Sequence, residues 1–91
     1  MSRKAEKQPT ATRSPMTRAA LELAIADAVR SFAPECSGLI GVIVERVVPG
    51  SPGAANWTLK GVKYGKAPRD RCRAAISAVV ADGQRDFEIS D

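Results

Sequence analysis

The chain contains no histidine, only two cysteines and only four aromatic residues among its 91 residues. The absence of histidine removes the commonest general base of enzymes and the commonest metal ligand. Cys36 and Cys72 lie far apart and form no Cys-x-x-Cys pair, which excludes the usual zinc, haem and thioredoxin-like spacings. The sequence therefore predicts a protein that is not an enzyme and that uses no metal ion or cofactor.

Long apolar runs are also absent. No stretch approaches the roughly 18 apolar residues of a membrane span. The Lys and Arg residues near the N-terminus are followed by Gln, Pro and Thr rather than by the apolar run of a signal peptide. We therefore expect a soluble cytoplasmic protein with no membrane partner and with reduced thiols. A disulfide between Cys36 and Cys72 is the alternative.

The net charge of +4 resides in the N-terminal segment, because residues 1–18 carry five Lys and Arg against Glu6. Residues 1–14 have little apolar content, so we expect a disordered basic tail there. Residues 15–91 are then a single small domain. A domain of this size hides only about 60% of the surface of its unfolded chain, so a partner subunit would stabilise it.

A first helix is predicted to begin between Ser14 and Thr17 and to end near Phe32. Ser14 followed by Pro15 at the first helical position is one N-cap, and Thr17 is the other. Pro34 ends the helix because proline disfavours helical geometry in the residue before it. The apolar face repeats with a helical period and comprises Leu21, Ile25, Ala28, Val29 and Phe32.

Residues 37–65 carry the only sustained β pattern and predict an antiparallel hairpin. Its strands are expected at residues 39–48 and 57–64, joined by a loop whose two Pro-Gly pairs make it too long for a tight turn. The second strand changes phase at its centre. A β-bulge at Gly61 would bring its four large apolar residues to one face, namely Trp57, Leu59, Val62 and Tyr64.

A second helix is predicted after Pro68, with an apolar face of Cys72, Ala75, Ile76, Val79 and Val80. It ends at Asp82–Gly83 or continues to Arg85. Phe87 and Ile89 then alternate with polar residues, which indicates a short third strand beside the hairpin. The predicted fold class is α+β, in the order α-β-β-α, with both helices packed on one face of a two-stranded antiparallel hairpin.

The C-terminal part carries a resemblance. Asn56 and Trp57 open the second strand, the following helix contains Ala and Ile repeats, and Gln84 and Phe87 lie near the end. In this order the last 40 or so residues resemble small uncharacterised proteins of alphaproteobacteria. The resemblance implies no activity.

The first strand of the hairpin is apolar on both faces, one of which carries Leu39, Ile43 and Val47. Such strands are usually covered on both sides. Because two helices cover only one face, a second copy or another protein is expected to cover the other. We therefore predict a protein–protein interaction module that homodimerises through its sheet, with Leu39, Ile43 and Val47 in the interface. Partial exposure of this face in a single chain is the alternative.

A cluster of six cations spans the exit of the hairpin and the start of the second helix: Lys60, Lys63, Lys66, Arg69, Arg71 and Arg73. The alternative function is therefore a nucleic-acid-binding accessory protein, whose cluster and basic tail contact phosphates. The element order invites comparison with double-stranded RNA-binding domains, although the third strand and the Lys-rich run of those domains are missing. A solvated charged surface is the simpler interpretation of the cluster.

Cys72 lies among these arginines near a helix start, where a thiol can become nucleophilic. Its spacing to Ile76 and Val79 favours a small buried side chain instead.

Overall fold

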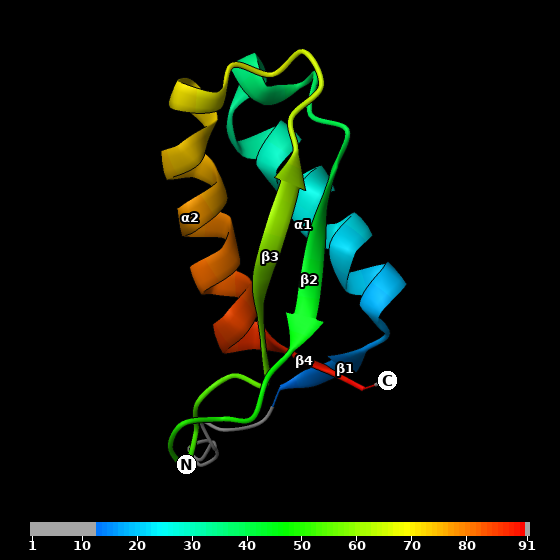
Figure 1. Ribbon diagram of the computed structural model, residues 1–91, viewed down its shortest axis with the longest axis vertical. Coiled ribbons are helices and arrows are strands. Elements are labelled where there is room, and N and C mark those ends of the chain that lie inside the picture. Colours follow the sequence, from blue (N-terminus) through cyan, green and yellow to red (C-terminus); the bar gives the residue numbers. More distant parts are fainter. Residues whose placement is uncertain (1–12, 91) are drawn as a thin grey trace, which may run out of the picture.

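The computed structural model describes residues 13–90 and confirms the α+β class. Helix α1 (Arg18–Phe32) is followed by strands β2 (Gly41–Arg46) and β3 (Trp57–Lys63) and by helix α2 (Arg69–Asp86). The two strands form the antiparallel hairpin, and both helices pack against the same face of it (Figure 1). Residues 1–12 of the expected tail lie outside the described residues.

Helix α1 begins after Thr17, whose hydroxyl oxygen accepts a hydrogen bond from the Ala20 amide at 3.2 Å. Thr17 is therefore the N-cap, and Ser14 is not. The buried side chains of α1 are Leu21, Ile25, Ala26 and Val29.

One predicted core residue of α1 is wrong, because Phe32 is 64% exposed. The buried face of the helix extends toward Ala26, and this rotation leaves Ala28 and Phe32 at its edge. Helical periodicity defines the apolar stripe but not how the stripe is turned toward the sheet.

The hairpin contains the predicted bulge. Ile43 pairs with Gly61, and the next residue of β2, Val44, pairs with Leu59, so Lys60 is the extra residue of β3. Trp57 is buried and the three following apolar residues pack against the core: Leu59, Val62 and Tyr64. Lys60 and Lys63 are exposed. The bulge thus places all four large side chains on the helix-facing side, as predicted.

The predicted C-terminal strand exists, but its expected place beside the hairpin is wrong. Strand β4 (Phe87–Ile89) pairs in parallel with β1 (Ser14–Met16) and forms a separate two-stranded sheet below the hairpin (Figure 1). Helix α2 continues past Gly83 to Asp86, so both the helix extension and the strand occur. The short β1 contains Pro15 and has no alternating pattern, which is why no strand is predicted there.

Arg13 and Ser14 belong to this fold and not to a tail. The Arg13 guanidinium donates hydrogen bonds to the backbone oxygens of Gln84 and Gly53, both at 2.7 Å. Ser14 is the first residue of β1 and pairs with Phe87. A single basic residue at the start of the fold therefore joins α2 to the loop between the hairpin strands.

The hairpin is joined to β4 by side chains. The Asn56 amide group donates to the Ile89 carbonyl and accepts from the Ile89 amide, at 3.0 and 2.9 Å. The Trp57 indole N–H donates to the Phe87 carbonyl at 3.1 Å, and Gln84 Nε2 donates to the Trp57 carbonyl at 2.8 Å. Asn56 thus takes the place of a pairing strand. The four residues named in the resemblance all lie in this network, where their role is structural.

Cys36 and Cys72 form a disulfide between the short 3₁₀ helix η2 (Pro34–Cys36) and the first turns of α2. Both side chains are fully buried. The expectation of reduced thiols is therefore wrong for this structure, whereas the burial of Cys72 on the apolar face of α2 is confirmed. The disulfide given above as the alternative is therefore the observed state, and it joins two segments that are separated in sequence by the hairpin. The Cα atoms are 5.9 Å apart, within the usual range for disulfides.

Gly65 turns the chain from β3 toward α2 and has a positive φ of 58°. A Cβ atom at this position would lie 2.8 Å from the Gly38 carbonyl oxygen and 2.7 Å from Ile40 Cγ1. We expect Gly65→Ala to lower the free energy of unfolding by about 1–3 kcal/mol, because both the backbone conformation and the space disfavour a side chain. Urea-induced unfolding measures this loss.

The control for this substitution is Gly50→Ala. A Cβ atom there meets nothing within 4 Å, and Gly50 has no positive φ. We expect its free energy of unfolding to stay within about 0.5 kcal/mol of the unmodified chain. Equal effects of the two substitutions would contradict the turn geometry at Gly65.

Candidate functional site

The two edges of the hairpin differ. At the outer edge of β2, the Val44 amide donates a hydrogen bond to Glu22 Oε2 of α1 at 3.0 Å. Arg30 of α1 donates to the carbonyl oxygens of Leu39 and Ile40, both at 2.9 Å. Side chains of α1 therefore bond to three backbone groups at or just before this edge, and a further strand that paired here would have to displace them.

The outer edge of β3 has no strand beside it within residues 13–90. Because the Val44 amide points away from β3, its partner Leu59 also directs its amide and carbonyl away from β2. The same holds for Val62, the partner of Val42. The Trp57 carbonyl lies on this edge and accepts from Gln84 of α2. Beyond Trp57, the backbone of Leu59 and Val62 therefore faces the space between β3 and α2.

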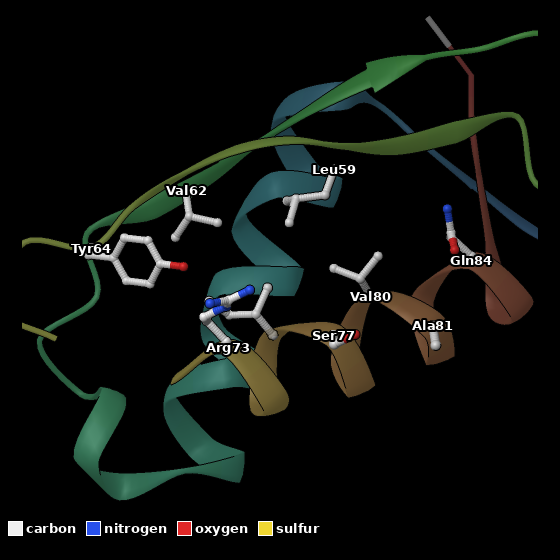
Figure 2. Close-up of a pocket in the computed structure, with 9 residues that line it drawn as sticks. Leu59, Val62, Tyr64, Arg73, Ser77, Val80, Ala81 and Gln84 are labelled. Carbon is white, nitrogen blue, oxygen red and sulfur yellow. The ribbon is translucent and has the colours of Figure 1, made fainter. Parts of the chain in front are cut away.

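That space contains a groove with a volume of about 390 Å³. Leu59 and Val62 point from β3 toward α2, and Arg73 and Val80 point back from the helix (Figure 2). Ile76 also lines the groove, and Gln84 closes the end near Trp57. The groove, which we call the β3–α2 groove, thus combines an apolar floor with an open strand edge.

The other end of the β3–α2 groove is cationic. A second hollow there is lined by Val62, Tyr64, Arg69 and Arg73. The Arg69 guanidinium lies 5.0 Å from the centre of the Tyr64 ring, in cation–π contact. Figure 2 shows Tyr64 and Arg73 at this same end. Neither hollow is lined by a carboxylate.

The six predicted cations lie along β3, the turn that follows it and the start of α2. Lys60 and Lys63 lie on β3, Lys66 lies in the turn that follows, and all six side chains are exposed: Lys60, Lys63, Lys66, Arg69, Arg71 and Arg73. Only Arg69 and Arg73 line the β3–α2 groove. The cluster therefore divides into two groove residues and four others.

The predicted interface residues do not share one exposed face. Leu39 lies before β2 and is buried in the core at 3% exposure, whereas Ile43 is 36% exposed on the outer face of the hairpin. Val47 follows β2 and is half-buried. Whether Ile43 or Val47 contacts a second copy stays a prediction.

Other candidate chemistry is limited in the part of the chain that the structure describes. Cys72 is held in the buried disulfide, so it offers no nucleophilic thiol. Within residues 13–90, no three acidic or cysteine side chains come together as a metal site, and no helix is long and apolar enough to cross a membrane. The β3–α2 groove is therefore the strongest candidate site.

The chain matches no protein-family model, and no curated protein or solved structure is similar enough to indicate a family. The resemblance of the C-terminal part stays a prediction.

Sequence reasoning identified the residues of the groove but not the groove. Leu59, Val62, Ile76 and Val80 read as ordinary core positions, and only Val80 and Ile76 are buried. The signal that could have indicated a groove is the element order itself, because it offers only two strands for two helices to cover. With α1 on β2 and α2 beside β3, a two-stranded sheet is too narrow to fill the space under α2.

Proposed function

We propose that this protein is a non-enzymatic interaction module that binds an extended segment of another protein in the β3–α2 groove. The observation that carries the proposal is the open edge of β3, where the backbone groups of Leu59 and Val62 face an apolar hollow. Edge strands with free backbone groups pair readily with an added strand.

The two edges of the hairpin support this proposal by their contrast. Glu22 and Arg30 occupy the β2 edge, and such coverage is how soluble proteins suppress unwanted strand pairing. The β3 edge lacks a comparable cover from Leu59 to Val62. Lys60, at the bulge, is the only charged residue between them.

The apolar floor would supply selectivity. In an added strand, alternate side chains point toward the same face. Those on the inner face would contact Leu59, Val62 and Ile76, so the bound segment needs apolar residues at every second position. Hydrogen bonds to the β3 edge provide affinity, and the apolar floor determines which positions of the bound segment must be apolar.

Amide hydrogen exchange tests strand addition. The probe is a neutral nine-residue peptide in which Val and Leu alternate with Thr, with a polyethylene glycol group for solubility. Saturating peptide is expected to slow exchange at the Leu59 and Val62 amides about tenfold or more, because both gain an acceptor. NMR measures each amide separately.

The Val44 amide is the internal control. It already donates to Glu22, so its exchange rate should change less than that of Leu59. Binding accompanied by protection only on the outer face, around Ile43, would contradict the β3–α2 groove as the site. Protection at neither face would contradict strand addition.

A further inference from the structure

The charges around the β3–α2 groove indicate what it binds. Resting on the function proposed above, we propose that the groove selects an acidic extended segment, with one of its carboxylates held between Arg69 and Arg73. The bound segment would have apolar residues facing the floor and Asp or Glu residues at its Tyr64 end and on its outer face.

Arg69 and Arg73 are available to an acidic ligand. They lie one helical turn apart on α2 and both line the cationic end of the groove. Within residues 13–90, neither forms a salt bridge. Cation–π contact with Tyr64 holds the Arg69 guanidinium at this end of the groove. A guanidinium can bind a carboxylate through two parallel N–H groups.

The charges of α2 oppose its helix dipole. Arg69, Arg71 and Arg73 lie at its N-terminal end against Asp70, and Asp82 and Asp86 lie at its C-terminal end against Arg85. Helices are stabilised by the opposite distribution. An arrangement that disfavours folding is explained when a binding partner requires it.

A second copy of this chain fits the groove poorly. Pairing of β3 with β3 across a twofold axis would place Lys60 and Lys63 close to the same residues of the second copy, because both are exposed on this strand. Residues 60–73 carry six cations against Asp70, so like charges would repel across the contact. The N-terminal segment has the same sign of charge and is excluded by the same argument.

Nucleic acid would use the cations but not the rest of the groove. Phosphates would contact Lys and Arg, while the apolar floor and the open backbone of Leu59 and Val62 would contribute nothing. An acidic peptide uses all three features at once, which is why the observations favour it.

The test compares three fluorescein-labelled nine-residue peptides with the full chain by fluorescence anisotropy. Val and Leu alternate with Glu, with Thr or with Lys. We expect the Glu peptide to bind about tenfold more tightly than the Thr peptide, and the Lys peptide to bind more weakly than both, because several exposed charge pairs act together. High salt should reduce the difference.

Matched variants locate the contact. Arg73→Gln is expected to weaken binding of the Glu peptide about fivefold and to leave the Thr peptide unchanged. Arg71→Gln removes the same charge from the same exposed helix turn but lies outside the groove lining. We expect it to change the affinity by less than about twofold.

Each remaining outcome would contradict a defined part of the proposal. Equal affinities for the Glu and Thr peptides, with Leu59 and Val62 still protected from exchange, would overturn the acidic selectivity and leave strand addition intact. No binding by any peptide would overturn both. Equal losses in Arg71→Gln and Arg73→Gln would overturn the assigned contact. Displacement of the Glu peptide by a DNA or RNA duplex, with both variants equally impaired, would assign the cluster to nucleic acid instead.

Discussion

Replacing Trp57 with Ala is expected to lower the free energy of unfolding by about 3–5 kcal/mol. Trp57 is the largest fully buried side chain, and its indole N–H also holds the Phe87 carbonyl. A Cβ atom at Gly83 would lie 3.3 Å from its ring, so the ring packs directly against the α2 backbone. The loss approaches the whole stability of a domain this small. Urea-induced unfolding followed by far-UV circular dichroism measures it, because Trp57 is the only tryptophan.

The control is Phe32→Ala. Phe32 is also a large aromatic residue, but it is 64% exposed at the edge of α1. We expect its removal to change the free energy of unfolding by about 0.5 kcal/mol or less, as is usual for surface positions. If Phe32→Ala destabilised the chain as much as Trp57→Ala, the orientation of α1 described above would be wrong.

Reduction of the Cys36–Cys72 disulfide is expected to lower the free energy of unfolding by about 3–4 kcal/mol. The bond closes a loop between residues separated by 36 positions, and its loss restores conformational freedom to the unfolded chain. Urea titrations with and without a reductant give the difference, and alkylation followed by mass spectrometry counts the free thiols.

The double variant Cys36→Ala with Cys72→Ala separates this effect from other actions of the reductant. Its unfolding midpoint should lie near that of the reduced chain and should not respond to reductant. Two alkylated cysteines in the denatured but unreduced chain would contradict the disulfide itself. The cytoplasmic location stays a prediction, and in a reducing compartment the domain would have the lower stability.

The sequence predicted the features that depend on local pattern. Both helices, both hairpin strands and the bulge follow from apolar periodicity, from Pro34 and Pro68, and from the change of phase at Gly61. The bulge is the most informative of these, because it was predicted from one requirement, that the four large apolar side chains of residues 57–64 lie on the same face.

The features that could not be predicted depend on contacts between distant segments. Strand β1 has only three residues and exists because β4 pairs with it. The disulfide depends on where η2 meets α2, and the exposure of Phe32 depends on how α1 turns toward the sheet. The groove arises in the same way, because α2 lies beside β3 and not over the centre of the hairpin.

The unequal edges of the hairpin also limit what kind of assembly it can form. Continuous growth of a sheet into a filament requires two edges that accept strands, one on each side. Here Glu22 and Arg30 already bond to backbone groups on the β2 side, whereas the β3 side from Leu59 to Val62 has no such contact among the described residues. A head-to-tail stack of hairpins, with the β2 edge of one against the β3 edge of the next, would have to displace these side chains at every contact, which disfavours growth into a fibre.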